Sequence, residues 1–265
     1  MIDNFQAAIL GVVQGLTEFL PVSSSAHLVL GQRILGLKEP ELLFDVAVHV
    51  GTLLAVVVFF WRDLWAMARG LWAQDDEGFR GRRLLWLVIV GSIPTAIIGL
   101  LFKDTFESLF ASVSAVSLAL LVTGGLLLST RFAPPARREV GRVGAGRALI
   151  VGLVQGIAIT PGISRSGSTI AAGLLLGVER RLAAHYSFLL SLPAICGALL
   201  LQLLHLRPGE TVDLTPLLVG GAVAGLTGIL ALKLLVGVVQ RGGLHWFAFY
   251  CWAVGLAALA WNFGG

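Results

Sequence analysis

The sequence contains few charged residues, which make up 13% of its 265 positions, whereas hydrophobic residues make up 57%. Soluble domains carry about 25% charged residues, so this chain has too few to cover a soluble surface around so much apolar content. Apolar runs of about 17–25 residues, long enough to cross a bilayer, recur along its whole length. The composition therefore predicts an all-α, polytopic membrane protein and argues against a soluble domain.

Cysteine is also scarce. Cys196 and Cys251 lie in separate apolar stretches without CxxC or Cys/His spacing, so neither a disulfide nor a zinc site is indicated. The N-terminal "MIDNFQAAIL" lacks the basic region of a signal peptide, and we expect it to be retained. The net charge of +4 does not indicate a nucleic-acid partner, because the arginines lie in short loops between apolar runs, where they report membrane topology.

The chain is expected to form a single integral membrane domain, 1–265. Its apolar segments lie at about 5–36, 42–60, 84–102, 110–130, 148–177, 183–206, 216–239 and 244–263. Segments 5–36 and 148–177 differ from the others, because a proline and a serine-rich stretch interrupt each near its middle. Such breaks at membrane depth are tolerated only where the backbone is buried in protein or lines a cavity.

The two interrupted segments resemble each other. Both contain G-x-V-Q-G, then an apolar stretch, then Pro and Ser. Gln14 matches Gln155, and Pro21 matches Pro161 with a slip of one residue. We therefore expect an internal repeat, with repeat one at about 1–130, repeat two at about 148–265 and a basic cytoplasmic linker at 131–147.

The basic residues indicate how the repeats are oriented. If both interrupted segments are re-entrant helix hairpins, six transmembrane helices remain, and one face carries thirteen arginines against four basic residues on the other. The first face holds Arg62, Arg69, Arg80, Arg82, Arg83, Arg131, Arg137, Arg138, Arg142, Arg147, Arg180, Arg181 and Arg241; the second holds Arg33, Lys38, Lys103 and Arg207. This bias favours a cytoplasmic first face, both termini outside and an inverted repeat whose hairpin tips meet near the midplane. Full crossings by both segments would give a weaker bias.

Polar and ionisable residues gather at the two interruptions, at a depth where they are costly and usually functional. The first holds Glu18, Ser23, Ser24, Ser25 and His27; the second, "PGISRSGST", holds Ser164, Arg165, Ser166, Ser168 and Thr169. For Ser25 and Ser168, a hydrogen bond to a backbone carbonyl of the preceding turn is an equally good interpretation. The remaining histidines have no serine, arginine or acid of this kind beside them, and we expect them to be structural or interfacial: His49, His185, His205 and His245.

These residue types together predict phosphoryl transfer. An arginine binds phosphate oxygens through paired hydrogen bonds, and glycines and serines around Arg165 free backbone N–H groups for an anion. Ser24 and His27 are three residues apart, so on one helix they share a face, as a nucleophile and its acid/base partner would. Glu18 could bind a divalent cation such as Mg²⁺ or Ca²⁺, or polarise the attacking group, and Gln14 shares its helix face.

The two interruptions also resemble the signature motifs of a known family. "QGLTEFLPVSSSAH" and "PGISRSGSTI" closely resemble the motifs of the bacterial undecaprenyl-diphosphate phosphatases, the bacitracin-resistance proteins. "FWRDLW", "GSIPTAIIGLLFKDTFESLF" and "YSFLLSLPAICGA" are similar to that family as well, so the resemblance covers nearly the whole chain. Two separate motifs in the family's order make it specific.

The resemblance implies hydrolysis of undecaprenyl diphosphate to the monophosphate, which recycles a lipid carrier of cell-wall synthesis, with help from a divalent cation. It implies interleaved inverted repeats in the bacterial plasma membrane and a site open to the outer side. It assigns Ser24 as nucleophile, His27 as its acid/base partner, Glu18 as the essential acid or metal ligand and Arg165 as the diphosphate clamp. The remaining expected substrate contacts are Gln14, also a candidate metal ligand, Ser23, Ser25, Ser164, Ser166 and Thr169.

The chain departs from the family pattern in two places. Many members carry a second acid where this chain has Gln14, and many carry glycine where it has Ala26, so a mechanism that needs two carboxylates is in doubt. A separate class of lipid phosphatase, with SGH and SR-x5-H-x3-D motifs, does not fit, because "SRSGSTIAAG" supplies no second His or Asp. A polyprenyl-lipid carrier is the alternative function, because broken inverted repeats also build carriers. The sequence does not decide whether the reaction passes through a covalent phosphoserine or uses an activated water. It also does not decide whether the protein is a homodimer or a monomer.

Overall fold

The computed structural model describes residues 2–37, 42–110, 112–135, 139–204 and 213–264. Of the residues discussed above, Lys38, Arg137, Arg138, His205 and Arg207 lie outside these ranges. Within the described ranges every regular element is a helix, which confirms the all-α fold.

The helices follow the apolar segments expected from the sequence. The first half contains α1 (Asn4–Phe19), α2 (Ser24–Ile34), α3 (Leu42–Phe59), α4 (Trp61–Arg69), α5 (Asp76–Leu101), α6 (Lys103–Phe110) and α7 (Val113–Ser129), followed by the short turns η1 (Thr130–Phe132) and η2 (Val140–Arg142). The second half contains α8 (Ala145–Ile157), α9 (Arg165–Leu175), α10 (Arg180–Leu204), α11 (Leu214–Gln240), η3 (Leu244–Trp246) and α12 (Phe247–Gly264). The sequence reasoning did not anticipate the short helices α4 and α6.

The described residues include five helices long and apolar enough to cross a membrane: α5, α7 with η1, α10, α11, and η3 with α12. A sixth is counted if α3 and α4, which are bent by 67° at their junction, form one span. The chain is therefore a multi-pass membrane protein. The helices α1, α2, α8 and α9 have 16, 11, 13 and 11 residues, fewer than the roughly 20 residues that a crossing requires.

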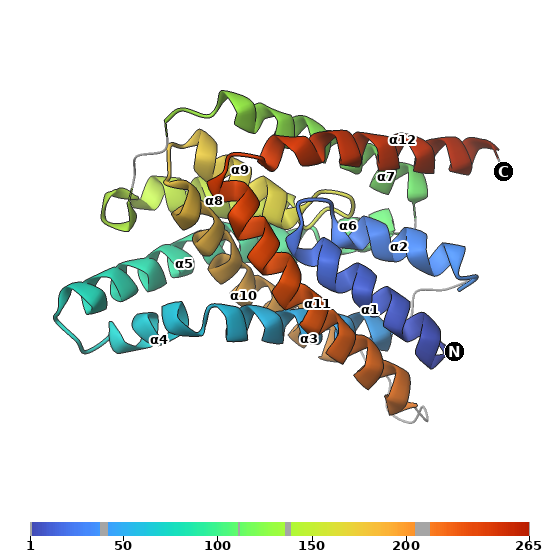
Figure 1. Ribbon diagram of the computed structural model, residues 1–265, viewed down its shortest axis with the longest axis horizontal. Coiled ribbons are helices and arrows are strands. Elements are labelled where there is room, and N and C mark those ends of the chain that lie inside the picture. The colour runs from blue at the N-terminus through green and yellow to red at the C-terminus, as the bar shows by residue number, and fades with distance from the viewer. Residues whose placement is uncertain (1, 38–41, 111, 136–138, 205–212, 265) are drawn as a thin grey trace.

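These four shorter helices form two hairpins. Asp3 caps the start of α1 by accepting a hydrogen bond from the Gln6 N–H, and Pro21, which has no N–H to continue a helix, follows its end. Figure 1 shows the α1–α2 and α8–α9 hairpins entering from opposite ends of the bundle, with their tips side by side at its centre. A Cβ atom built on Gly167 of α9 would lie 3.0 Å from the Pro21 Cβ. The two interruptions of the sequence are therefore neighbours in space.

Both hairpins pack on the other half of the chain through glycine. A Cβ atom on Gly11 of α1 would lie 2.6 Å from the carbonyl oxygen of Gly220 in α11, and one on Gly152 of α8 would lie 1.9 Å from the carbonyl oxygen of Gly91 in α5. Gly11 and Gly152 occupy the same position in the repeated G-x-V-Q-G motif. The repeated glycine thus allows direct backbone contact in each half.

We expect replacement of Gly152 by alanine to lower the free energy of unfolding by about 1–3 kcal/mol, because the methyl group must displace the backbone of α5. Gly146→Ala in the same helix is the matched control, since a Cβ atom there meets nothing within 4 Å. Thermal unfolding in detergent provides the comparison. Equal melting temperatures for the two variants would contradict the close packing of α5 on α8.

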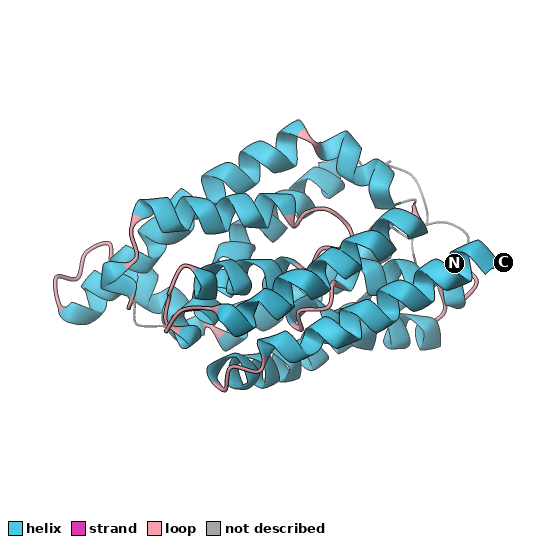
Figure 2. Cartoon of the chain, turned by 90° about the horizontal axis from the view of Figure 1, so that it is seen from above, coloured by secondary structure: helices cyan, strands magenta, loops and turns pink. Residues whose placement is uncertain are grey.

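One end of the bundle holds the chain termini, and the opposite end holds the connection between α4 and α5 (Figure 1). Figure 2 shows the same two ends from above. The helices that flank this connection carry arginines near it: Arg69 ends α4, and Arg80, Arg82 and Arg83 lie in the first turns of α5. Arg69 forms ion pairs with Asp75 and with Glu77, the latter at 3.1 Å.

Candidate active site

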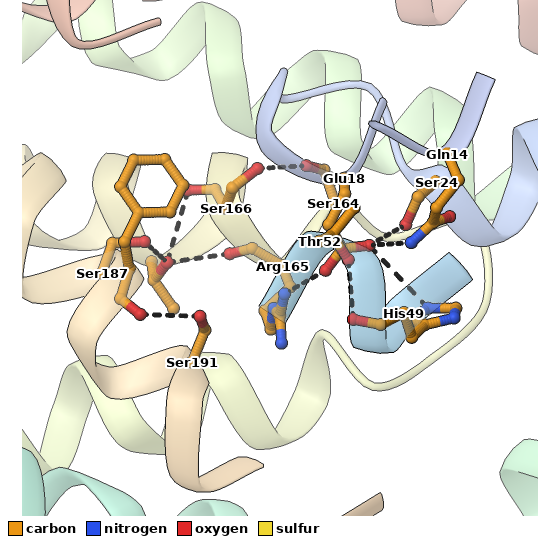
Figure 3. A network of polar contacts seen from close by, with 12 residues as sticks. Gln14, Glu18, Ser24, His49, Thr52, Ser164, Arg165, Ser166, Ser187 and Ser191 are labelled. Atoms are coloured by element: carbon orange, nitrogen blue, oxygen red, sulfur yellow. Dashed lines mark hydrogen bonds and ion pairs between the residues drawn. The ribbon is translucent and has the colours of Figure 1, made fainter. Parts of the chain in front are cut away.

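The Glu18 carboxylate lies where the two hairpin tips meet, with 7% of the residue's surface exposed. Its Oε1 forms an ion pair with the guanidinium of Arg165, the first residue of α9. Its Oε2 accepts hydrogen bonds from the Ser24 hydroxyl at 2.6 Å and from the Gln14 side-chain amide at 3.0 Å (Figure 3). One carboxylate therefore joins residues of both hairpins.

Arg165 begins a helix, so its positive charge adds to the positive end of the helix dipole. Ser164 caps this helix by accepting the N–H of Gly167 at 3.1 Å. A partly buried ion pair such as Arg165–Glu18 is weak evidence for stability, because both charges lose much of their hydration. A guanidinium retained at a helix N-terminus inside a membrane protein is instead a suitable site for an anion such as phosphate.

The hydroxyl of Ser24 reaches Glu18 after an unusual turn of the chain. Ser23, the residue before α2, has a left-handed φ of 67°, which is rare for a residue other than glycine. Backbone conformations of this kind cost about 1–3 kcal/mol and cluster at functional sites. The turn at Ser23 coincides with the point where Ser24 faces the carboxylate.

His27 shares α2 with Ser24, but its ring nitrogens are engaged elsewhere. Its Nδ1 lies 2.8 Å from the carbonyl oxygen of Ser23, and its Nε2 lies 2.8 Å from the hydroxyl of Tyr250 in α12. The His27 and Tyr250 rings are also stacked, with centroids 5.7 Å apart. The structure thus gives Ser24 a hydrogen bond to Glu18, and the direct bond between Ser24 and His27 that the sequence suggested is not formed.

The other hydroxyls at the first tip connect it to the second. The Ser25 hydroxyl accepts the Gly162 N–H at 3.3 Å and lies 3.0 Å from the Ser23 hydroxyl. From the opposite side, the Ser166 hydroxyl lies 3.5 Å from the carbonyl oxygen of Leu20. These contacts hold the two tips against each other around Glu18.

Thr169 and Ser168 lie further along α9. The Thr169 hydroxyl donates to the carbonyl oxygen of Arg165 at 2.8 Å and also contacts the hydroxyl of Ser187 in α10. Ser168 is buried, and its hydroxyl has no hydrogen-bond partner among the described residues. Neither side chain makes a described contact with Glu18 or Ser24.

His49 of α3, which the sequence led us to expect as structural or interfacial, lies at the site. Its Nε2 lies 3.9 Å from the Oε2 of Glu18 (Figure 3). Its Nδ1 lies 2.7 Å from the carbonyl oxygen of Asp45, so Nδ1 carries a hydrogen and Nε2 faces the carboxylate. Thirty-one positions separate His49 from Glu18, and no local spacing pattern brings them together. Tyr250 was missed for the same reason.

Two oxygens at the site are suitable for a divalent cation. The Gln14 side-chain nitrogen must face the Glu18 carboxylate, because a carboxylate only accepts hydrogen bonds. The Gln14 Oε1 therefore points elsewhere, and it is buried without a described partner. The described residues contain no group of three or more His, Cys, Asp or Glu side chains arranged to hold a metal. Glu18 and Gln14 can hold one cation once the Gln14 amide turns its Oε1 toward the carboxylate, and phosphate and water would supply the other ligands, as is common for Mg²⁺.

Comparison with known proteins agrees with these observations. The sequence model of the family described as bacitracin resistance protein BacA matches residues 7–257. A protein of Desulfatibacillum aliphaticivorans named undecaprenyl-diphosphatase is 46% identical over 275 residues, covering 97% of this chain and 98% of its own. A protein of Methanosphaera stadtmanae with the same name is 41% identical over 274 residues, covering 98% of each chain. The chain belongs to the bacitracin resistance protein BacA family.

Proposed function

We propose that this protein is a membrane phosphatase that hydrolyses undecaprenyl diphosphate to undecaprenyl phosphate and inorganic phosphate. The observation that carries the proposal is the buried Glu18 carboxylate, which contacts both the hydroxyl of Ser24 and the guanidinium of Arg165. A base, a nucleophile and an anion clamp in contact are the parts that phosphoryl transfer requires. The name carried by the relatives points to the same substrate. Recycling of a cell-wall lipid carrier, and with it bacitracin resistance, would follow from this activity.

In this proposal Glu18 acts as the base. Its Oε2 takes the proton of the Ser24 hydroxyl, 2.6 Å away, as the Ser24 oxygen attacks the terminal phosphorus. The bond from that phosphorus to the bridging oxygen breaks, and undecaprenyl phosphate leaves. Water then releases phosphate from Ser24; in the alternative path Ser24 and Glu18 orient a water that attacks the phosphorus directly.

Arg165 binds the diphosphate oxygens through its planar guanidinium, beside the N-terminus of α9. Substrate oxygens then share Arg165 with Glu18, which frees the carboxylate to accept a proton. Ser23 and Ser25 border this position and are proposed to contact phosphate. Ser164, Ser166 and Thr169 are proposed to act beside them, although the hydroxyls of Ser164 and Thr169 already bond to the backbone of α9.

His27 is proposed to serve as the acid/base group for the leaving phosphate. Its Nδ1 faces the Ser23 carbonyl, so this nitrogen carries a hydrogen and Nε2 is the position that exchanges a proton. Tyr250 occupies Nε2 at 2.8 Å. Substrate must therefore displace the Tyr250 hydroxyl, or receive the proton by way of it.

A divalent cation is proposed to bind the Glu18 carboxylate and the Gln14 Oε1, and it would neutralise phosphate charge. We expect EDTA to stop phosphate release, and Gln14→Ala to raise the Mg²⁺ concentration for half-maximal rate by about 10-fold. Gln155→Ala is the matched control, because this glutamine holds the same position in the second hairpin and bonds to Thr95 and the Leu190 carbonyl, both at 3.2 Å. An unchanged Mg²⁺ requirement in Gln14→Ala would contradict this assignment.

The site is proposed to open to the outer side of the plasma membrane. The arginine-rich end of the bundle is the cytoplasmic one by the positive-inside rule. Next to Glu18 in the chain, the Phe19 ring is almost completely buried against Phe188, with centroids 5.7 Å apart, and Phe188 packs on Phe60 at the same distance. The matching glycine contacts of α1 with α11 and of α8 with α5 support an inverted repeat.

The experiment is phosphate release from undecaprenyl diphosphate in detergent with Mg²⁺, by the native protein and by Ser24→Ala. We expect release by the native protein and about 10³-fold less by the variant. Ser112→Ala, a hydroxyl that caps α7, controls for general effects of serine removal. Failure of well-folded native protein to release phosphate would reject the phosphatase and favour the lipid carrier, which lipid flipping in vesicles would then test.

A further inference from the structure

The loop before Arg165 is tied to a helix outside its own hairpin. Thr123 of α7 is 1% exposed. Its hydroxyl oxygen accepts the N–H of Ser164 at 3.1 Å. Its single hydrogen has two acceptors within reach, the carbonyl oxygen of Gly162 at 3.0 Å and that of Ala119 in its own helix at 3.1 Å. A single hydroxyl thus lies within hydrogen-bond distance of an N–H and a carbonyl of the loop in the three residues that precede Arg165.

One face of α7 forms the surface on which this loop rests. Val116, Ala119, Thr123 and Leu127 follow one another at spacings of three and four, so they share that face. Gly162 has a left-handed φ of 94°, and a Cβ atom there would lie 2.2 Å from the Val116 carbonyl oxygen. The loop backbone therefore contacts α7 directly, and Thr123 is the polar residue at that contact.

The same loop also contacts the first hairpin. The Gly162 N–H donates to the Ser25 hydroxyl at 3.3 Å, while its carbonyl faces Thr123. The loop is therefore held between α7 and the first hairpin. Arg165 follows Ser164 directly and reaches Glu18 from this fixed start.

We infer that Thr123 is a positioning residue for Arg165: its hydroxyl fixes the loop backbone so that the guanidinium meets Glu18 and the diphosphate. The inference rests on the proposed function of the site. Without the hydroxyl, the Ser164 N–H and the Gly162 carbonyl lose a buried partner, and the loop shifts to satisfy them. A shift of about 1 Å at a positioning group can cost about 10²-fold in rate.

The test replaces Thr123 with valine, which has a similar shape and no hydroxyl, and with serine, which keeps the hydroxyl. We expect Thr123→Val to raise KM for undecaprenyl diphosphate about 5-fold or more and to lower kcat/KM about 10- to 100-fold. Thr123→Ser is expected to stay within about 3-fold of the native enzyme. Partial unfolding alone would lower the apparent kcat and leave KM unchanged.

Ser117→Ala is the matched control in the same helix. Ser117 is also 1% exposed, and its hydroxyl donates to the Val113 carbonyl of its own helix at 2.7 Å. Its removal is expected to leave KM unchanged. A raised KM in Ser117→Ala equal to that of Thr123→Val would assign the effect to α7 in general and overturn the inference.

Hydrogen–deuterium exchange of residues 158–168 gives a readout independent of catalysis. We expect faster exchange in Thr123→Val, and native exchange in Thr123→Ser and Ser117→Ala. Native KM together with native exchange in Thr123→Val would overturn the positioning role. If the native protein hydrolyses no lipid diphosphate while the loop loosens only in Thr123→Val, the proposed function fails and the tie between Thr123 and the loop stands.

Discussion

Glu18→Gln is expected to lower the rate of undecaprenyl diphosphate hydrolysis by about 10³-fold or more, because an amide cannot accept the proton of Ser24. Glutamine has nearly the size of glutamate but lacks the negative charge that contacts Ser24 of the first hairpin and Arg165 of the second. The partly buried Arg165 then loses its counter-ion, so the melting temperature is expected to fall as well. The rate should therefore be measured by phosphate release at a temperature where the variant is folded.

Two companion variants separate chemistry from charge loss. Glu18→Asp keeps the charge and shortens the side chain, so we expect it to remain folded and to retain more activity than Glu18→Gln. Glu107→Gln, on the exposed face of α6 and 3.7 Å from Lys103, should hydrolyse at the native rate. Native activity in folded Glu18→Gln would show that this carboxylate is not the base.

Arg165→Lys is expected to lower kcat/KM about 10²-fold while the fold is retained. Lysine preserves the positive charge beside Glu18, but it lacks the planar fork that binds two phosphate oxygens. The measurement is steady-state phosphate release over a range of lipid diphosphate concentrations.

Arg62→Lys is the matched control, since Arg62 is exposed on α4 and far from either tip in sequence. It should match the native enzyme. If Arg165→Lys also matched it, Arg165 would serve only as a point charge, and paired recognition of the diphosphate would be rejected.

Much of the fold could be predicted from the sequence, because hydrocarbon imposes a strong rule on composition and length. The apolar runs located the spanning helices, and the prolines at Pro21 and Pro161 marked the two hairpins. The repeated motif led us to expect that both tips would meet, and the structure brings Glu18 and Arg165 into contact. Helix α4 escaped prediction because its mixed composition gives no apolar run.

The partners within the site could be predicted less well, because periodicity gives a helix face but not the direction of each side chain. Ser24 and His27 share α2, yet the Ser24 hydroxyl donates to Glu18, whereas the His27 Nδ1 contacts the carbonyl oxygen of Ser23. His49 and Tyr250 reach the site from α3 and α12. Such contacts depend on tertiary packing, for which a single sequence carries no local signal.

A double-mutant cycle between Glu18 and Arg165 tests most directly whether the two hairpin tips form one catalytic site. The values of kcat/KM are measured for native protein, Glu18→Gln, Arg165→Gln and the double variant, all at a temperature where each is folded. Groups that act as one unit give strongly non-additive losses. The account predicts that the double variant is about as active as the weaker single variant. Losses that multiply, as for independent sites, would contradict it.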